Sequence, residues 1–215
     1  MAKTQSHKMT IVGCGPGSPD YLTEAGRRAI GNAAVLVGSP DLLDRYATPA
    51  HEQIRFGSDI ESALEAIASR FENEKIAILV SGDPGLCSLA RPVIRRFGRD
   101  AFEVLPGVSS VQLAFARLGL DWLDTRIVSA HKGIPDLTPE DLAGSGNIAI
   151  LAGHRHSQSW IADLADTLGN ERFLVVCEDL SLQSEKIRHV SVPEFRRLRI
   201  STRSVVLLLK EDVFR

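Results

Sequence analysis

Cysteine is scarce in this sequence and is not arranged in pairs. Cys14, Cys87 and Cys177 are odd in number and lie far apart, so the sequence predicts neither a disulfide framework nor a cysteine zinc site. Each lies where an expected strand passes into a loop. We expect all three to pack as small, reduced hydrophobic side chains, with a shared thiol site as the alternative.

Long apolar runs and an excess of positive charge are also missing. No stretch approaches the ~18 consecutive apolar residues of a membrane span, and residues 1–8 lack the apolar core of a signal peptide, so we expect a cytoplasmic protein. The formal net charge is -2 over 215 residues. The chain therefore lacks the overall positive field that would predict binding to nucleic acid or to an anionic membrane. Recognition of an acidic ligand would need local clusters of cations.

Several catalytic signatures are absent as well. The sequence contains no P-loop lysine, no serine elbow flanked by glycines and no His-Glu-x-x-His pattern, so phosphoryl transfer, acyl hydrolysis and zinc proteolysis lack their reacting groups. No metal site is predicted. A chain without a ready nucleophile suits chemistry in which a bound cofactor carries the reactivity and the protein supplies orientation.

The sequence does contain a regular alternation of apolar runs and amphipathic segments. This alternation is typical of an α/β fold in which buried, mainly parallel strands are covered by helices. The clearest helical stripe lies in residues 59–71, behind an N-cap at Ser58 or Asp59, and Pro139 and Pro193 mark two further helix starts. We expect strands at residues 10–12, 35–37, 76–80, 103–105, 126–129, 147–151, 173–177 and 204–210.

The length suits one large domain or two small ones. The segment Leu118–Asp124 contains Gly119, placed to end a helix, and it separates a half rich in glycine motifs from a half with fewer. We therefore expect two α/β lobes, residues 1–118 and residues 119–215, with the active site in the cleft between them.

Three glycines, Gly13, Gly15 and Gly17, directly follow the first expected strand. The dinucleotide-binding pattern needs a third glycine where this chain has Ser18, and it needs a helix that starts at the glycines, whereas here the helix is delayed to about Thr23. The second strand also ends without the acidic residue that holds a ribose. A nicotinamide site is therefore disfavoured, and a glycine turn that serves only close packing is the other alternative for this stretch alone.

Two more loops of similar build follow later strands. Residues 81–88 read SGDPGLCS, an open and rigid turn, and in LPGVSSVQ the residues Ser109 and Ser110 can cap a helix or present hydroxyl groups to a ligand. Ligands bind at the carboxyl ends of strands in α/β folds. Three such loops therefore predict one shared site more readily than three independent turns.

Together VGCGPGSPDYLT, SGDPG and LPGVSSVQLAFARLG resemble the tetrapyrrole methylase family of S-adenosylmethionine-dependent methyltransferases, and the likeness spans nearly the whole chain. Within it, PGVSSVQLAFARLGLDW and SAHKG resemble the branch that methylates carbon C5 of a corrin precursor in cobalamin biosynthesis. The resemblance implies two α/β lobes, a homodimer, and S-adenosylmethionine held in the cleft largely by backbone groups. The 215 residues leave no room for a second cofactor domain, so where C15 methylation and decarboxylation accompany this activity, a separate enzyme would supply them.

The resemblance also assigns a cofactor site, residue by residue. Ala152 and the segment EDLS after Cys177 match less distinctive cofactor-contacting stretches of the family. Asp83 has a structural alternative, because an aspartate before proline often only caps a turn. The residues that match the family's more distinctive cofactor motifs are Pro16, Gly82, Asp83, Leu86, Ser109 and Ser110.

A corrin precursor carries many carboxylates, so local cations are expected to bind it. One candidate pair is His131 and Lys132, and a second cluster is His154, Arg155 and His156, each after a second-lobe strand. His131 is also a candidate catalytic residue that takes a proton during methylation. Solvated loop side chains are the structural alternative for both clusters.

Two further functions stay open at the level of the sequence. One is a methylase of the same fold that acts on another tetrapyrrole position or on ribosomal RNA, although two Trp, two Tyr and no run of lysines disfavour RNA. The other is a protein that binds the cofactor or a tetrapyrrole without catalysis. Sequence cannot separate it from an enzyme, because methyl transfer from a sulfonium needs no signature nucleophile.

Overall fold

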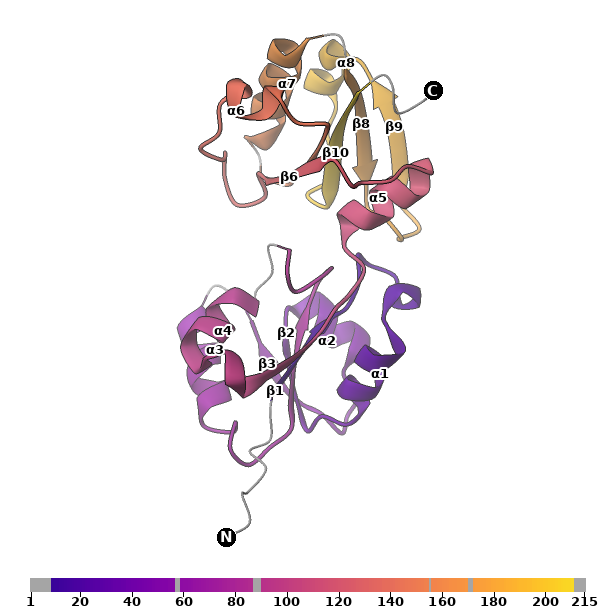
Figure 1. Cartoon of the computed structure of the whole chain (residues 1–215). Coiled ribbons are helices and arrows are strands. Elements are labelled where there is room, and N and C mark those ends of the chain that lie inside the picture. Colours follow the sequence, from indigo (N-terminus) through magenta and orange to yellow (C-terminus); the bar gives the residue numbers. More distant parts are fainter. Residues whose placement is uncertain (1–8, 57–58, 87–89, 155, 170–171, 211–215) are drawn as a thin grey trace. The chain divides into compact units, whose positions relative to one another are not determined.

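The computed structural model describes residues 9–56, 59–86, 90–154, 156–169 and 172–210. The chain divides into two compact units, Met1–Ser109 and Ser110–Arg215, and each contains one five-stranded sheet with helices (Figure 1). The helix that the sequence analysis placed at the end of the first lobe groups with the second unit in this division. Cys87 and Arg155 lie outside the described residues, as does Ser58, one of the two expected caps.

The first unit is built on a parallel sheet with strand order β3-β2-β4-β1-β5. Four of its strands coincide with expected ones. The short strand β3 was missed, because three of its four residues are exposed and it forms no apolar run. The strands are β1 (Met9–Gly13), β2 (Val35–Gly38), β3 (Glu52–Arg55), β4 (Ile76–Val80) and β5 (Phe102–Leu105); the helices are η1 (Pro19–Tyr21), α1 (Glu24–Gly31), α2 (Pro40–Tyr46), α3 (Ile60–Ala68), α4 (Ala90–Phe97) and η2 (Arg99–Ala101).

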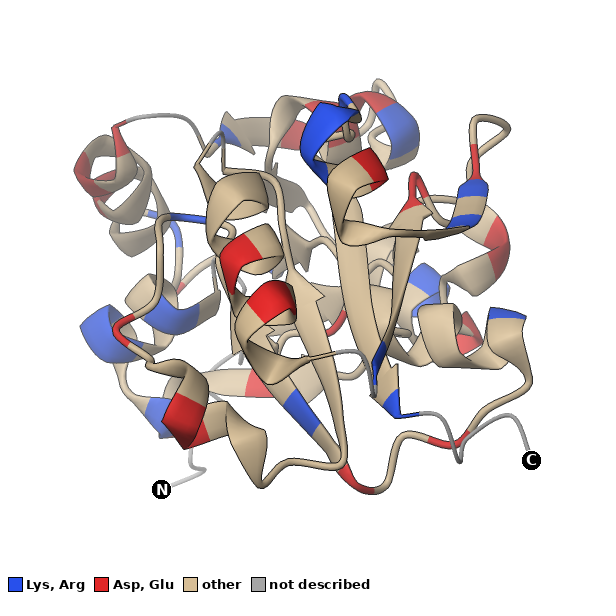
Figure 2. Cartoon of the chain, turned by 90° about the horizontal axis from the view of Figure 1, so that it is seen from above, with Lys and Arg blue, Asp and Glu red and all other residues tan. Residues whose placement is uncertain are grey.

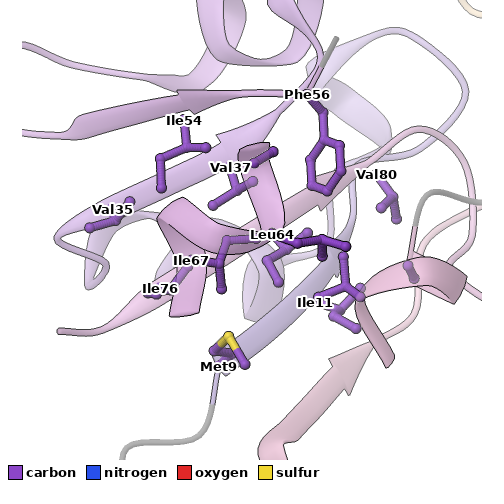
Figure 3. Close-up of a cluster of buried hydrophobic side chains, with 14 of the residues drawn as sticks. Met9, Ile11, Val35, Val37, Ile54, Phe56, Leu64, Ile67, Ile76 and Val80 are labelled. Carbon is purple, nitrogen blue, oxygen red and sulfur yellow. The ribbon is translucent and has the colours of Figure 1, made fainter. Parts of the chain in front are cut away.

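Both faces of the first sheet are buried, which explains the continuous apolar strands. All five residues of β4 are buried. Figure 1 shows α3 and α4 on one face and α1 on the other, and Figure 3 shows Leu64 and Ile67 of α3 among strand side chains such as Ile11. The cap of α3 is Asp59, whose Oδ1 accepts the Ser62 N–H at 3.0 Å. The cap at Asp59 and the buried stripe through Leu64 and Ile67 are thus confirmed, whereas the helix is shorter than expected and ends at Ala68.

The second unit has a mixed sheet with strand order β6-β7-β10-β8-β9. Only the β6–β7 pair is parallel, and the other three pairs are antiparallel. Its elements are α5 (Ser110–Leu118), β6 (Thr125–Ser129), α6 (Pro139–Ala143), β7 (Asn147–Leu151), α7 (Ser157–Leu168), β8 (Arg172–Glu178), β9 (Lys186–Val190), α8 (Val192–Arg197) and β10 (Ser204–Lys210).

The expectation of mainly parallel strands is therefore wrong for the second sheet. Sequence reasoning missed β9, whose residues KIRHV carry three basic side chains and form no apolar run. Without β9, strands β8 and β10 read as two parallel strands joined by one long crossover. In the structure a short loop turns β8 back into β9, and α8 then leads into β10.

The expected helix boundaries of the second unit are confirmed. Thr138 and Ser191 each form a capping box with an acidic residue three positions on, and each precedes a helix with proline in its first turn. Gly119 and Gly169 follow α5 and α7 with φ of 68° and 81°, the left-handed region that glycine reaches without strain. Among the described residues, no helix is long and apolar enough to cross a membrane.

Burial keeps two of the cysteine thiols protonated. Desolvation raises the pKa of Cys14 and of Cys177 to about 12 in each case. Because thiolates rather than thiols react, both should resist modification in the folded chain. In a Cys87→Ser background at pH 8, we expect a disulfide reagent to modify both thiols only as fast as the chain unfolds. Rapid modification of either thiol without denaturant would contradict this expectation.

Candidate functional site

Three glycine-bearing loops of the first unit gather at one edge of its sheet. Strand β1 lies between β4 and β5, and all three run in the same direction. Gly13 is in register with Val80, and Val12 with Leu105. Their carboxyl ends are therefore side by side, and the loop after each strand emerges next to the others. The expectation that these loops meet is confirmed.

The first two loops are joined through their backbones. The Gly15 N–H donates to the Gly82 carbonyl oxygen at 3.3 Å, and the Gly82 N–H donates to the Gly15 carbonyl oxygen at 2.8 Å. The Cys14 N–H donates to the Val80 carbonyl oxygen at 2.8 Å. These bonds extend the β1–β4 pairing beyond the strands and fix Pro16 and Gly82 on adjoining segments.

The first and third loops approach so closely that neither can carry a side chain at the contact. A Cβ on Gly13 would lie 2.5 Å from the Gly107 nitrogen, and a Cβ on Gly107 would overlap the Gly82 carbonyl oxygen. Real Cβ atoms do not approach backbone this closely, so both positions require glycine for packing. The close packing considered for the first glycine stretch is thus right for Gly13, and Gly107 packs in the same way, which brings the loops together.

Asp83 ties the second loop to the third. Its Oδ1 accepts the Gly85 N–H at 2.8 Å, and its Oδ2 accepts the Gly107 N–H at 3.1 Å. The structural role considered for Asp83 is therefore confirmed. Both carboxylate oxygens serve the loops themselves, so a ligand would meet the backbone around Asp83 more readily than its side chain.

Gly82 differs from the packing glycines. Its φ is 68°, yet among the residues that the structure describes the nearest atom to a Cβ built there is the Ser109 Cα at 3.9 Å. Free space therefore remains beside the Gly82 backbone, between the second loop and Ser109, which is buried. Leu86 follows on the same loop, and its N–H closes the turn by donating to the Asp83 carbonyl oxygen at 3.1 Å.

Two of the three objections to a dinucleotide site, the delayed helix and the missing acidic residue, hold in the structure. Helix α1 starts at Glu24, where Thr23 Oγ1 caps the Gly26 N–H at 3.0 Å, and η1 separates that start from the glycines. Strand β2 ends at Gly38 and is followed by Ser39. Only the single-turn 3-10 helix η1 directly follows the first glycine loop among the described residues, so no α-helix N-terminus is placed there to face a pyrophosphate.

The second unit gathers its own group of loops at one edge of the mixed sheet. Ser129 and Leu151 end parallel neighbours in register. Strand β10 is antiparallel, so its first residue, Ser204, pairs with Glu178 at the end of β8. The segments after β6, β7 and β8 and the segment before β10 therefore lie at the same edge.

His131, after β6, is held by the loop after β7. Its Nδ1 lies 3.1 Å from the Ala152 carbonyl oxygen, and because a carbonyl only accepts, the proton in this contact belongs to Nδ1. Gly153 has φ of 126°, and a Cβ there would lie 2.9 Å from His131 Nδ1. The structure thus brings His131 and Ala152 together, with Lys132 exposed beside them.

His154 follows on the same loop and starts α7 through its backbone. Its carbonyl oxygen accepts from the Ser157 N–H at 2.9 Å and from the Ser157 hydroxyl at 2.7 Å. Its ring lies 5.4 Å from that of His156 between centroids. Among the described residues, no group of three or more His, Cys, Asp or Glu side chains is arranged to hold a metal ion.

Sequence reasoning missed the segment Ser201–Arg203, which precedes β10. The Ala152 N–H donates to the Ser204 carbonyl oxygen at 2.9 Å, and a Cβ on Gly153 would overlap the Thr202 carbonyl oxygen. In a parallel sheet only residues after strands reach this edge. The antiparallel direction of β10 brings residues before a strand to it, and recognising β9 was the signal that could have revealed this.

Comparison with known proteins identifies the family of this chain. A family model described as Tetrapyrrole (Corrin/Porphyrin) Methylases matches residues 8–196. This chain belongs to that family. It is therefore an S-adenosylmethionine-dependent methyltransferase, as the three motifs of the sequence indicated.

Two similar proteins have named activities. A cobalt-precorrin-7 C(5)-methyltransferase from Salmonella typhimurium is 30% identical over 185 residues, which are 86% of this chain and 90% of the relative. A decarboxylating precorrin-6Y C(5,15)-methyltransferase from Mycobacterium tuberculosis is 30% identical over 183 residues, which are 83% of this chain and 45% of the relative. Both names concern C5 methylation of corrin precursors.

Solved structures show the same fold. A cobalt precorrin-4 methyltransferase matches with a TM-score of 0.82 and 21% identity, over 97% of each chain. A uroporphyrin-III C-methyltransferase from Thermus thermophilus, complexed with S-adenosylhomocysteine, matches with a TM-score of 0.75 and 22% identity, over 94% of this chain and 97% of that one. The α/β fold of the tetrapyrrole methylases is thereby confirmed for this chain.

The first-unit loops fit a cofactor that backbone groups hold. Among the described residues other than its two chain neighbours, Ser109 Cα is the one atom within 4 Å of a Cβ built on Gly82, and the neighbouring glycines and Asp83 keep this main chain in place. Glycine allows close approach of a ligand to backbone where any side chain would stand in the way.

The Asp83 tie can be tested by an isosteric change. Asp83→Asn replaces one accepting oxygen with an NH₂ group that faces a backbone N–H, so we expect a loss of about 1–3 kcal/mol in the free energy of unfolding. Urea denaturation measures this loss. Asp44→Asn is the control, because Asp44 forms an exposed pair with Arg55 at 3.5 Å, and the loss of such a pair should cost below about 1 kcal/mol. Equal losses in the two variants would contradict the structural role.

Proposed function

We propose that this chain methylates carbon C5 of a corrin precursor, precorrin-6Y or cobalt-precorrin-7, in cobalamin biosynthesis. The choice of C5 is supported by the 30% identity, over 86% of the chain, to a relative named for that reaction. The placement of the methyl donor is supported by one observation above all, the meeting of three loops beside the open Gly82 backbone.

The bound S-adenosylmethionine would supply a methyl group already activated on a sulfonium. The chain's own residues then have the task of orientation, since direct transfer to a ring carbon needs the two reacting atoms held close and in line. Pro16, Gly82 and Ser109 come from three different loops, so together they define a position more tightly than one loop could. Ser110 and Ala152 belong to the same proposed donor site.

Carboxylates of the corrin precursor would be bound by cations of the second unit. Lys132 is exposed next to His131, at the edge where four segments converge. His154 and Arg155 are proposed for the same role. Figure 2 shows Lys and Arg interspersed with Asp and Glu along the elements, so local cations rather than a broad field would recognise the substrate.

His131 is also the proposed proton acceptor. Because its Nδ1 donates to the Ala152 carbonyl oxygen, Nε2 is the nitrogen that carries the lone pair in the neutral ring. The bond to a rigid backbone carbonyl would also keep the ring in one orientation, which a proton transfer requires.

The homodimer and a separate C15-methylating and decarboxylating enzyme belong to the same proposal. The second candidate function is methylation of another tetrapyrrole position, favoured by the 0.82 TM-score to a precorrin-4 methyltransferase. The ribosomal RNA alternative lacks a stripe of basic and aromatic side chains. A non-catalytic protein would bind ligand without turnover.

Substitution of Gly82 tests the donor site. Gly82→Ala and Gly98→Ala both place alanine at positive φ, 68° and 80°, and neither Cβ meets an atom of the described residues closer than 3.9 Å. Each should lose about 1–3 kcal/mol of unfolding free energy, because alanine disfavours positive φ. Only Gly82→Ala should weaken binding of S-adenosylhomocysteine, by tenfold or more in calorimetry. Equal affinities in the two variants would contradict binding of the donor beside Gly82.

Turnover tests the reaction itself. Incubation with S-adenosylmethionine and either corrin precursor should add one methyl group to the precursor by mass spectrometry, and fragmentation or NMR should place it at C5. Lys132→Gln should lower kcat/KM for the corrin about tenfold while leaving S-adenosylhomocysteine affinity unchanged, because a charge-assisted contact is lost only to the substrate. Methylation at another carbon would support the second candidate, and binding without methyl gain would support the carrier.

A further inference from the structure

Two residues of the loop between β8 and β9, residues 179–185, have an unusual backbone. Asp179 has φ of 48° and Ser181 has φ of 70°, and they are the only non-glycine residues at positive φ among those that the structure describes. Side chains disfavour this region, and such strain persists only where surrounding contacts over-determine it. The loop also starts at the edge of the second sheet where His131, Ala152 and Thr202 lie.

Contacts on the first half of this loop fix it to the segment before β10. Asp179 Oδ1 accepts the Ser201 hydroxyl at 2.8 Å, and the Asp179 N–H donates to the Arg203 carbonyl oxygen at 3.0 Å. The preceding residue, Glu178, is 5% exposed; it accepts the Ser201 N–H at 2.8 Å and pairs with Arg188. These bonds account for the left-handed turn at Asp179.

The second half is held by a different element, helix α5. Arg117, in the last turn of α5, donates to both carboxylate oxygens of Glu185, at 2.7 and 3.3 Å. Glu185 Oε2 in turn accepts the Ser181 N–H at 2.5 Å. The hydrogen bond from Arg117 holds the pKa of Glu185 below its usual value, so the carboxylate stays charged at neutral pH.

We infer that Arg117 and Glu185 are positioning residues for methyl transfer, which hold the strained backbone at Ser181 so that the loop after β8 is pre-formed for the methyl donor. This inference rests on the proposed function. Neither side chain needs to touch a ligand. Helix α5 itself starts at Ser110, in the third glycine loop, and its last turn anchors the loop that continues the segment EDLS. Ser110 and EDLS are both proposed contacts of the donor. Pre-forming a loop raises affinity by removing the cost of ordering it on binding.

The first test compares donor affinity in variants of the pair. Glu185→Ala and Arg117→Gln should each weaken S-adenosylhomocysteine binding at least fivefold in calorimetry, and should raise KM for S-adenosylmethionine with little change in kcat. Arg117→Lys should recover part of the affinity, because it restores a charge but not the two-fold hydrogen bond. Arg196→Gln is the matched control, since Arg196 also bridges two carboxylate oxygens in this unit, those of Asp163 and Asp166.

The second test separates positioning from stability. Ser181→Gly removes the backbone strain, so its melting temperature should rise by about 2–4 °C, while its affinity for S-adenosylhomocysteine should fall at least threefold because the free loop is less ordered. Amide exchange at Ser181 should be faster in Glu185→Ala than in the wild-type chain. A purely structural role predicts that stability and affinity move in the same direction.

The results distinguish a failure of this inference from a failure of the proposed function. Pair variants that bind S-adenosylhomocysteine within twofold of the wild-type chain would overturn the inference and leave the proposed function standing. So would affinity losses no larger than that of Arg196→Gln. A wild-type chain that binds no S-adenosylhomocysteine would overturn the proposed function and the inference together.

Discussion

The candidate site of the first unit depends on one steric constraint, the direct backbone contact between neighbouring loops. Gly13 and Gly107 approach so closely that a methyl group on either would collide with main-chain atoms, and Gly82 lies at the same junction. Parallel strands deliver the loops to one edge, but only the absence of side chains lets them touch. The Asp83 carboxylate then ties two of them together, which leaves the open backbone at Gly82 with a fixed shape.

The second unit reaches a comparable result by other means. Its edge is assembled from strands of both directions, and its segments are held by polar bonds together with one close glycine contact, that of Gly153 with Thr202. His131 is bound to the loop after β7, and Ser201 is bound by the acidic residues at the end of β8. This arrangement strains the backbone at Asp179 and Ser181; bonds to Ser201 and Arg203 hold Asp179, and Glu185, paired with Arg117 of α5, holds Ser181. A site of this kind is more sensitive to single polar substitutions than the glycine junction.

Much of the first unit could be predicted from sequence, because its strands are buried on both faces and therefore appear as continuous apolar runs. The three loops could be predicted to meet for the same reason, since parallel strands end at one edge. Strands β3 and β9 could not be predicted, because edge strands with exposed charged residues lack such a run. Missing β9 hid the antiparallel direction of β10, and with it the contribution of Ser201–Arg203. The capping role of Asp83 was available from its place before proline, whereas its bond to Gly107 spans 24 positions and needed the fold.

The central claim is that the methyl donor lies against the backbone at the meeting point of the three first-unit loops. A crystal structure of the chain with S-adenosylhomocysteine tests this most directly. The account predicts ligand atoms within hydrogen-bond distance of the main chain at Gly82 and in van der Waals contact with Pro16 and Ser109. A ligand bound away from these loops, or loops that separate when it binds, would contradict the account.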